Sequence, residues 1–111
     1  MSSAREAAVQ ALVRTEEGGY SNLVLKSQLA RFGGTAQERA FAAAVFYGTV
    51  ERKNTLDYCL GKFLQKPLFR LDAPVRAILR AGLYQAKYMQ SVPVHAAVSE
   101  SVALCRRMRK A

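Results

Sequence analysis

Apolar residues recur every three or four positions through nearly all of this sequence, and that spacing restricts the chain to helical folds. The glycine pairs Gly18-Gly19 and Gly33-Gly34, together with Pro67, Pro74 and Pro93, divide the pattern into segments. No segment alternates apolar and polar residues in the way of a half-buried strand. The sequence therefore predicts an all-α fold, a bundle of about five or more helices joined by short loops.

Capping residues predict where several of these helices begin. Ser3 with Glu6, and Thr35 with Glu38, have the spacing of a capping box. In that motif the hydroxyl accepts one backbone amide and the carboxylate accepts the other. Ser21 is a candidate N-cap for the helix between the two glycine pairs. We therefore expect helices to start next to residues 3, 21 and 35.

The segment VFYGTVERKNTLDYCL, from Val45 to Leu60, contains a glycine within a helical pattern. Its register continues through Gly48 to about residue 65, which predicts one long helix or two nearly collinear ones. Glycine inside a helix costs about 1 kcal/mol relative to alanine, and close approach of another helix is the simplest compensation. We expect the helix to leave the core near Arg52, with Glu51 and Lys53 in water.

Two more helices follow Asp72 and Pro93, with a proline in or beside the first turn. On the first of them the apolar stripe predicts an inner face of Val75, Ile78, Leu79, Gly82, Leu83 and Ala86. On the second it predicts an inner face of Val94, Ala97, Val98, Ser101, Val102, Cys105 and Met108.

The net charge of +9 lies entirely in the second half of the chain. Residues 1–51 hold five basic and five acidic residues, whereas residues 52–111 hold twelve basic residues against three acidic ones. Such asymmetry favours a polyanionic partner. Nucleic acid fits better than a membrane surface, because no helix combines a basic face with bulky exposed aromatic residues. The alternative is that the charge only keeps a small domain in solution.

Two basic clusters are the candidate phosphate contacts. Arg76 and Arg80 lie one turn apart, off the apolar stripe, and Lys87 follows on the same side. The C-terminal sequence CRRMRK supplies Arg106, Arg107, Arg109 and Lys110. Basic residues near the C-terminal end of a helix also complement the helix dipole. Part of this cluster could therefore stabilise the helix instead of contacting RNA. Tyrosine rings can stack on unpaired bases, or they can form the partly buried edge of a core. Either role is open to the five tyrosines, Tyr20, Tyr47, Tyr58, Tyr84 and Tyr88.

The sequence has few residues in patterns that would support catalysis or metal binding. The single histidine, His95, and the distant cysteines Cys59 and Cys105 do not make a metal site, and the glycine pairs do not follow a strand as phosphate loops do. The longest apolar run, AFAAAVFY, is far shorter than the roughly 18 residues of a membrane span. We therefore expect a cytoplasmic binding domain with reduced cysteines, without a small-molecule substrate and without a membrane partner.

Several segments, in their order and spacing, resemble the NusB-type RNA-binding domain. They cover nearly the whole chain: AREAAVQALV (4–13), RAFAAAVFYGTVERKNTLDYCL (39–60) and VRAILRAGLYQAKYMQSVPVHAAVSESVALCRR (75–107). A second set looks more like the N-terminal domain of RsmB (Sun/Fmu) type rRNA cytosine-C5 methyltransferases: YSNLVL (20–25), YGTVERKNTLDYCL (47–60), LRAGLYQ (79–85) and VPVHAAVSESV (92–102). The resemblance implies an all-α, NusB-like fold.

The methyltransferase resemblance implies a domain that docks an enzyme on small-subunit rRNA. S-adenosylmethionine and the catalytic cysteine would belong to a separate, C-terminal catalytic domain, so this chain alone is expected to bind no cofactor and to methylate nothing. Partners would be rRNA and that catalytic domain. Arg5 stands where NusB proteins carry several arginines, and joins the expected RNA contacts. Residues 1–111 are expected to be one domain of a longer protein. The family's final helix would be missing and part of the second-half core uncovered.

Two other functions stay open at this point. A NusB-type antitermination factor would bind a short single-stranded RNA and a small-subunit ribosomal protein. A helical protein–protein docking module would carry its basic charge incidentally. Charge reversal at Arg106 and Arg107 separates these two classes, because it weakens RNA binding but leaves docking to a protein intact.

Overall fold

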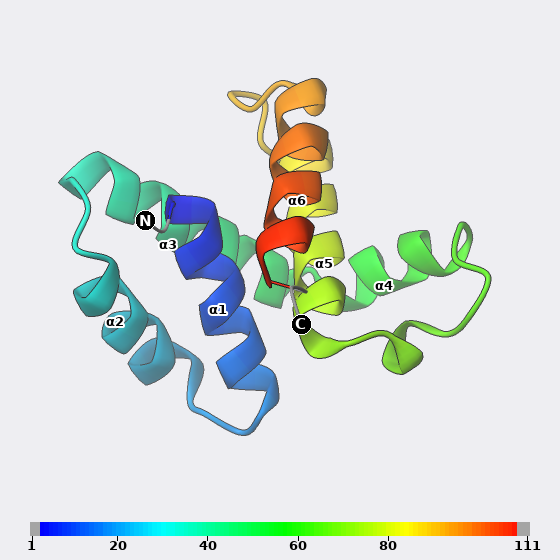
Figure 1. Cartoon of the computed structure of the whole chain (residues 1–111), viewed down its shortest axis with the longest axis horizontal. Coiled ribbons are helices and arrows are strands. Elements are labelled where there is room, and N and C mark those ends of the chain that lie inside the picture. Colours follow the sequence, from blue (N-terminus) through cyan, green and yellow to red (C-terminus); the bar gives the residue numbers. More distant parts are fainter. Residues whose placement is uncertain (1–2, 109–111) are drawn as a thin grey trace.

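The computed structural model describes residues 3–108, which form six α-helices and one turn of 3-10 helix (Figure 1). No strand occurs within these residues, so the all-α prediction is confirmed. None of the described helices has the length and apolarity that crossing a membrane requires. The elements in chain order are α1 (Ala4–Glu16), α2 (Ser21–Phe32), α3 (Ala36–Glu51), α4 (Lys53–Gly61), η1 (Leu68–Arg70), α5 (Ala73–Tyr88) and α6 (Val94–Met108).

The first three helices pack together, with α1 in contact with both α2 and α3 (Figure 1). Small buried residues, Ala8 and Ala11 on α1 and Ala42 on α3, allow these helices to approach closely. Val45 and Phe46 of α3 fill the space between them and are fully buried. The core of the first half therefore depends on alanines at helix contacts as much as on large side chains.

Helix α5 connects the two halves of the molecule, because it packs against α1 and α3 as well as α4 and α6. Its buried face consists of Ala77, Ile78, Ala81 and Gln85. Of the inner face predicted for this helix, Ile78 is fully buried and the other five residues are half-buried, so that prediction is confirmed only in part. The reason is that α5 has neighbours on several sides, and the apolar stripe faces only one of them.

Three helix starts test the capping predictions. The Thr35–Glu38 capping box is confirmed, since the Glu38 amide donates to the Thr35 hydroxyl (3.0 Å) and the Thr35 amide donates to the Glu38 carboxylate (2.8 Å). Only half of the first box forms: Ser3 accepts the Glu6 amide at 3.1 Å, while the Glu6 carboxylate accepts from other side chains. The predicted helix start at residue 21 is confirmed, but the capping role of Ser21 is wrong, because the N-cap is Tyr20 and it makes no side-chain hydrogen bond.

A single residue, Arg52, separates α3 from α4, with φ −108° and ψ 19°. The segment is therefore two helices rather than one long helix, and α4 ends at Gly61 rather than near residue 65. Gly48 is buried, and a Cβ there would collide with the Tyr84 ring of α5. The predicted close approach of another helix is confirmed. Glu51 and Lys53 are exposed, as expected.

Helix α6 packs mainly against α5, which leaves much of its apolar surface in water. Ala97 and Leu104 are buried, whereas Val94, Val98 and Val102 are exposed. The predicted inner face of α6 is therefore wrong at the three valines. A helix with one main neighbour buries a narrower stripe than its sequence offers.

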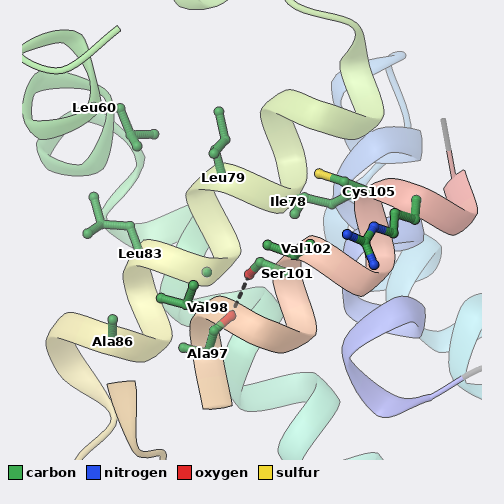
Figure 2. Close-up of a pocket in the computed structure, with 12 residues that line it drawn as sticks. Leu60, Ile78, Leu79, Leu83, Ala86, Ala97, Val98, Ser101, Val102 and Cys105 are labelled. Atoms are coloured by element: carbon green, nitrogen blue, oxygen red, sulfur yellow. Dashed lines mark hydrogen bonds between the residues drawn. The ribbon is translucent and has the colours of Figure 1, made fainter. Parts of the chain in front are cut away.

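Half-buried apolar residues of α5 and exposed valines of α6 line a groove of about 440 Å³ (Figure 2). Leu79 and Leu83 of α5 and Val98 of α6 point into it, and Leu60 of α4 lies at its side. On its floor the Ser101 hydroxyl donates to the Ala97 carbonyl at 2.7 Å. The groove agrees with the expectation that part of the second-half core is uncovered.

Candidate nucleic-acid interface

Arg76 and Arg80 face α1 and α4 rather than open solvent. Arg80 donates twice to Asp57, at 2.7 and 3.0 Å, and once to Glu16 at 3.1 Å. Arg76 donates to both oxygens of Glu16 and to the Leu71 carbonyl. Their side chains are only 16% (Arg76) and 11% (Arg80) exposed. These two guanidiniums therefore tie α5 to its neighbours and offer little free surface to a phosphate.

The ion pairs perturb the acid and the base in opposite directions. The hydrogen bond from Arg76 holds the pKa of the Glu16 carboxyl below its ordinary value, although partial burial of the carboxyl opposes this change. The same hydrogen bond raises the pKa of Arg76. Glu16 is thus kept ionised by its two guanidinium partners, and the cluster has no net positive charge left over.

Arg5 and Arg107 lie near the start of α1 and also have internal partners. The Arg5 Nε donates to the Gln85 side chain at 2.7 Å, and its guanidinium lies 5.1 Å from the Phe41 ring centroid. Arg107 pairs with Glu6 at 3.0 Å but keeps half of its side chain in solvent. These contacts fasten α1 to α5 and α6. As RNA contacts, both residues remain predictions.

The other predicted contacts do not join these arginines in one cluster. Arg106 is exposed and is one of the residues that line the α5–α6 groove. Arg109 and Lys110 lie outside the described residues. The seven predicted side chains thus include two inside an ion-pair network, two at the start of α1 and one at the groove.

The structure points instead to α4 and the loop that carries η1, which sequence reasoning missed. We name this region the α4–η1 surface and define it by four cations and three aromatics: Lys53, Lys62, Lys66, Arg70, Tyr58, Phe63 and Phe69. All seven are exposed, and Phe63 and Phe69 reach 83% and 75%. Within residues 3–108, none of the four cations forms an ion pair with a carboxylate.

A signal for this surface is present in the sequence KFLQKPLFR, residues 62–70. Basic residues recur there every four positions, two phenylalanines lie between them, and no acidic residue interrupts them. The predicted helix extended into this segment, to about residue 65, and the predicted stacking residues were all tyrosines. Lys62 already uses one aromatic neighbour, since its ammonium lies 4.7 Å from the Tyr58 ring centroid.

Arg52 marks a second place where cations meet aromatic rings. Its guanidinium lies 4.2 Å from the centroid of Tyr88, which in turn stacks on Tyr84 at 5.5 Å. Tyr84 and Tyr88 are half-buried, so they are core-edge residues, whereas Tyr20, Tyr47 and Tyr58 are exposed. This stack holds the end of α5 against the break between α3 and α4.

The exposed side chains of the α4–η1 surface are of the kinds that bind nucleic acids. Exposed lysine and arginine side chains contact phosphates, and exposed aromatic rings stack on unpaired bases. Within residues 3–108, no group of three or more His, Cys, Asp or Glu side chains is placed to hold a metal ion. His95 is exposed, and Cys59 and Cys105 are free thiols.

Comparison with known proteins relates this chain to the NusB family. The sequence model of the NusB family matches residues 2–111. "Probable ribosomal RNA small subunit methyltransferase B" of Bacillus subtilis (strain 168) is 36% identical over 105 residues, which cover 94% of this chain and 23% of that protein. "Transcription antitermination protein NusB" of Halorhodospira halophila is 34% identical over 106 residues, which cover 96% of this chain and 68% of that protein. This chain thus spans about a quarter of the methyltransferase's length.

A solved structure shares the fold. The NusB and NusE antitermination factors in complex with double-stranded RNA provide a chain that superposes with a TM-score of 0.86. The match covers 95% of this chain and 80% of that chain at 20% sequence identity, a level that establishes the fold alone.

Proposed function

Because this chain belongs to the NusB family, we propose that it is the RNA-binding domain of a small-subunit rRNA methyltransferase and docks that enzyme on rRNA. The match to about a quarter of a methyltransferase's length supports this assignment, since a domain that supplies binding occupies a part of such a protein. Methyl transfer and S-adenosylmethionine would belong to a separate catalytic domain of the enzyme, in the cytoplasm.

The observation that carries this proposal is the α4–η1 surface. Its four cations lack carboxylate partners within the described residues, so their charge is available to phosphates. Phe63 and Phe69 are too exposed to contribute to the core, and they offer flat faces for unpaired bases. Phosphate contacts supply affinity and salt dependence with little sequence choice. This domain would therefore hold the enzyme on RNA, and other contacts would select the target base.

The test measures binding of a small-subunit rRNA fragment by fluorescence anisotropy at about 50 and 200 mM salt. Wild-type protein should bind more weakly at the higher salt. The double variant Lys62→Glu/Lys66→Glu should bind more weakly than wild type, and its slope of log K against log salt should fall by about 1.4 units for single-stranded RNA. Negligible binding at low salt, or binding that is independent of salt, would contradict the proposal.

A matched control separates a local effect from one of net charge. The double variant Lys26→Glu/Arg31→Glu changes the charge by the same amount on exposed positions of α2. It should keep most of the wild-type affinity. Equal losses in the two double variants would mean that only the overall charge matters, and the α4–η1 surface would lose its role.

Transcription antitermination is the second candidate. It is favoured by the NusB protein of Halorhodospira halophila, because this chain covers 68% of that protein's length. The length of the natural reading frame distinguishes the two functions. A frame about four times the length of this chain supports the methyltransferase, whereas one about one and a half times its length supports the antitermination factor.

A further inference from the structure

The loop that joins α4 to α5 carries most of the α4–η1 surface but packs weakly against the rest of the fold. We call residues 62–71 the η1 loop, and they include five of the seven members of that surface. In Figure 1 the chain leaves the bundle after α4 and returns through η1 to the start of α5. Leu64, Leu68 and Leu71 are half-buried, and the other seven residues of the loop are exposed. Apolar burial alone therefore gives this loop little local stability.

A side chain of α5 holds the backbone of this loop. The Arg76 Nη1 atom donates to the carbonyl oxygens of Leu71 and of Phe69, the latter at 3.4 Å. Within the described residues, these are the hydrogen bonds that join residues 65–71 to the remainder of the fold. The two other hydrogen bonds of this segment run between its own backbone groups. The hydrogen-bonded attachment of the η1 loop thus depends on one guanidinium.

Glu16 of α1 fixes the direction in which Arg76 presents that nitrogen. The Glu16 carboxylate accepts from the Nε atom of Arg76 at 3.0 Å, and its other oxygen accepts from Nη2. A guanidinium is planar and rigid, so holding two of its three nitrogens also sets the direction of the third. Helix α1 is therefore linked to the η1 loop through two side chains.

The same contacts leave Arg76 poorly placed to bind a phosphate itself. Each of its three nitrogens has an acceptor, and its side chain is only 16% exposed. The carboxylate of Glu16 offsets its charge. A substitution at Arg76 should therefore affect RNA through the position of the loop and not through a lost phosphate contact.

We propose that Arg76 is a positioning residue for RNA binding, which holds the η1 loop in the conformation that presents Lys66, Phe69 and Arg70 to the RNA. Glu16 orients Arg76 for this role. The inference rests on the proposed RNA-binding function and adds the residues that organise its surface. A loop that adopts the binding conformation for only part of the time lowers the apparent affinity by that fraction.

The first test follows the loop in the free protein, without RNA. Backbone ¹⁵N relaxation gives order parameters for the Phe69, Arg70 and Leu71 amides, which are about 0.85 for a rigid backbone and below about 0.6 for a flexible one. Wild type should be near the rigid value. Arg76→Lys should approach the flexible value, because an ammonium lacks the planar fork that reaches a carboxylate and two carbonyls together. Unchanged order parameters in Arg76→Lys would overturn the inference.

Arg80→Lys is the matched control, because Arg80 lies one turn along α5 and also contacts Glu16. Its hydrogen bonds go to Glu16 and Asp57, and none reaches the η1 loop within residues 3–108. This variant should have a lower melting temperature, while its loop keeps the order parameters of wild type. An equal loss of loop order in both lysine variants would mean that loop order only follows overall stability, and the positioning role would be wrong.

Glu16→Gln is a milder variant that keeps the arginine and weakens the pair that orients it. The order parameters of the loop should fall, but by less than in Arg76→Lys. Glu17→Gln, at the exposed neighbouring position, should leave them unchanged. If Arg76→Lys does not fold, this pair decides the question: a loop as ordered in Glu16→Gln as in Glu17→Gln contradicts the inference.

The second test measures the RNA affinity of two Arg76 variants at several salt concentrations. Arg76→Lys and Arg76→Gln should both bind about five-fold more weakly, as expected for a loop that is in its binding position about a fifth of the time. The slope of log K against log salt should stay at the wild-type value, because the cations that contact phosphates are unchanged.

A direct phosphate contact by Arg76 predicts a different pattern. Arg76→Lys would then bind like wild type, because it keeps the charge, and Arg76→Gln would lower the slope by about 0.7 units for single-stranded RNA. That result would refute the positioning role.

The two tests separate this inference from the proposed function. If RNA binds with the expected salt dependence but the Arg76 variants keep wild-type loop order and affinity, the positioning role is wrong and the RNA-binding function stands. If the wild-type protein binds no RNA at low salt, the proposed function fails. The role of Arg76 in RNA binding then fails with it, even where the relaxation data show that Arg76 holds the loop.

Discussion

The arginines of α5 and the cations of the α4–η1 surface carry the same charge in different environments. Arg76 and Arg80 are mostly buried and each contacts a carboxylate of another helix. Lys62 and Lys66 are exposed and have no acidic partner within the described residues. A planar guanidinium suits a fixed bidentate pair, whereas a flexible, hydrated ammonium suits a solvent-facing phosphate contact. The number of basic residues therefore overstates the charge that a partner can reach.

The largest expected effect tests the structural side of this comparison. Arg80→Met should lower the free energy of unfolding by about 3 kcal/mol, because it leaves Asp57 without its partner and Glu16 with one fewer. Chemical denaturation measures this loss, and RNA affinity should change less than three-fold. Arg31→Met, at an exposed position of α2, is the control and should change stability by less than about 0.5 kcal/mol. Unchanged stability with weakened RNA binding would make Arg80 a phosphate contact.

The next effect concerns the aromatic part of the α4–η1 surface. Phe63→Ser combined with Phe69→Ser should weaken binding of single-stranded RNA by about 2 kcal/mol, since each exposed ring offers a stacking face. The melting temperature should stay close to that of wild type, because both rings lie outside the core. Tyr20→Ser removes an equally exposed ring at the start of α2 and should not weaken binding. A clear loss of stability in the phenylalanine variant would instead assign these rings to packing.

A smaller effect is the pH dependence contributed by Glu16. Its pKa is lower in the folded protein than the ordinary value of 4.5. As the pH falls, Glu16 therefore takes up a proton in the unfolded chain before it does so in the folded protein. The stability that ionised Glu16 contributes is complete above its ordinary pKa and declines as the pH falls below that pKa. Glu16→Gln should be less stable at neutral pH and show a shallower acid decline. Glu17→Gln, next to it and exposed, should keep the wild-type decline; identical profiles for both variants would remove Glu16 as the source.

The smallest effect is expected at Arg107. Its pair with Glu6 is half-exposed on the arginine side, so Arg107→Ala should cost about 0.5 kcal/mol of stability. Arg106→Ala, which removes an exposed arginine with no ion pair in the described residues, should cost less. Thermal melting at low salt gives both values. A loss of more than about 2 kcal/mol at Arg107 would place it with Arg80 among the structural arginines.

Local signals predicted much of the fold. The helical spacing and the Thr35–Glu38 box depend on residues within a few turns of each other. The Gly48 contact depends on the absence of one side chain. Gly33 likewise ends α2 in the left-handed conformation, with φ 73°. The spacing, the box and the Gly33 helix end are specified over short distances, and the Gly48 contact was predictable because a glycine on an apolar helix face indicates a close neighbour.

The inner faces of α5 and α6 and the internal role of the arginines were not readable in this way. Glu16 and Arg76 are sixty positions apart, and nothing in either local sequence specifies that they meet. Whether Val98 is buried depends on how many helices cover α6. For the candidate site, helical periodicity was misleading beyond Gly61: it extended the helix to about residue 65, whereas the exposed phenylalanines and lysines there lie in the loop after α4.

The contact between Gly48 and Tyr84 has a mechanical consequence. Tyr84 rests directly on the backbone of α3, it stacks on Tyr88, and Arg52 lies over Tyr88 at the junction with α4. These contacts connect α3, α5 and the junction from which α4 starts. A side chain at position 48 would push the tyrosines outward and swing α4 together with its lysines. The direction in which the domain presents its charge thus depends on one missing methyl group on the opposite side of the helix junction.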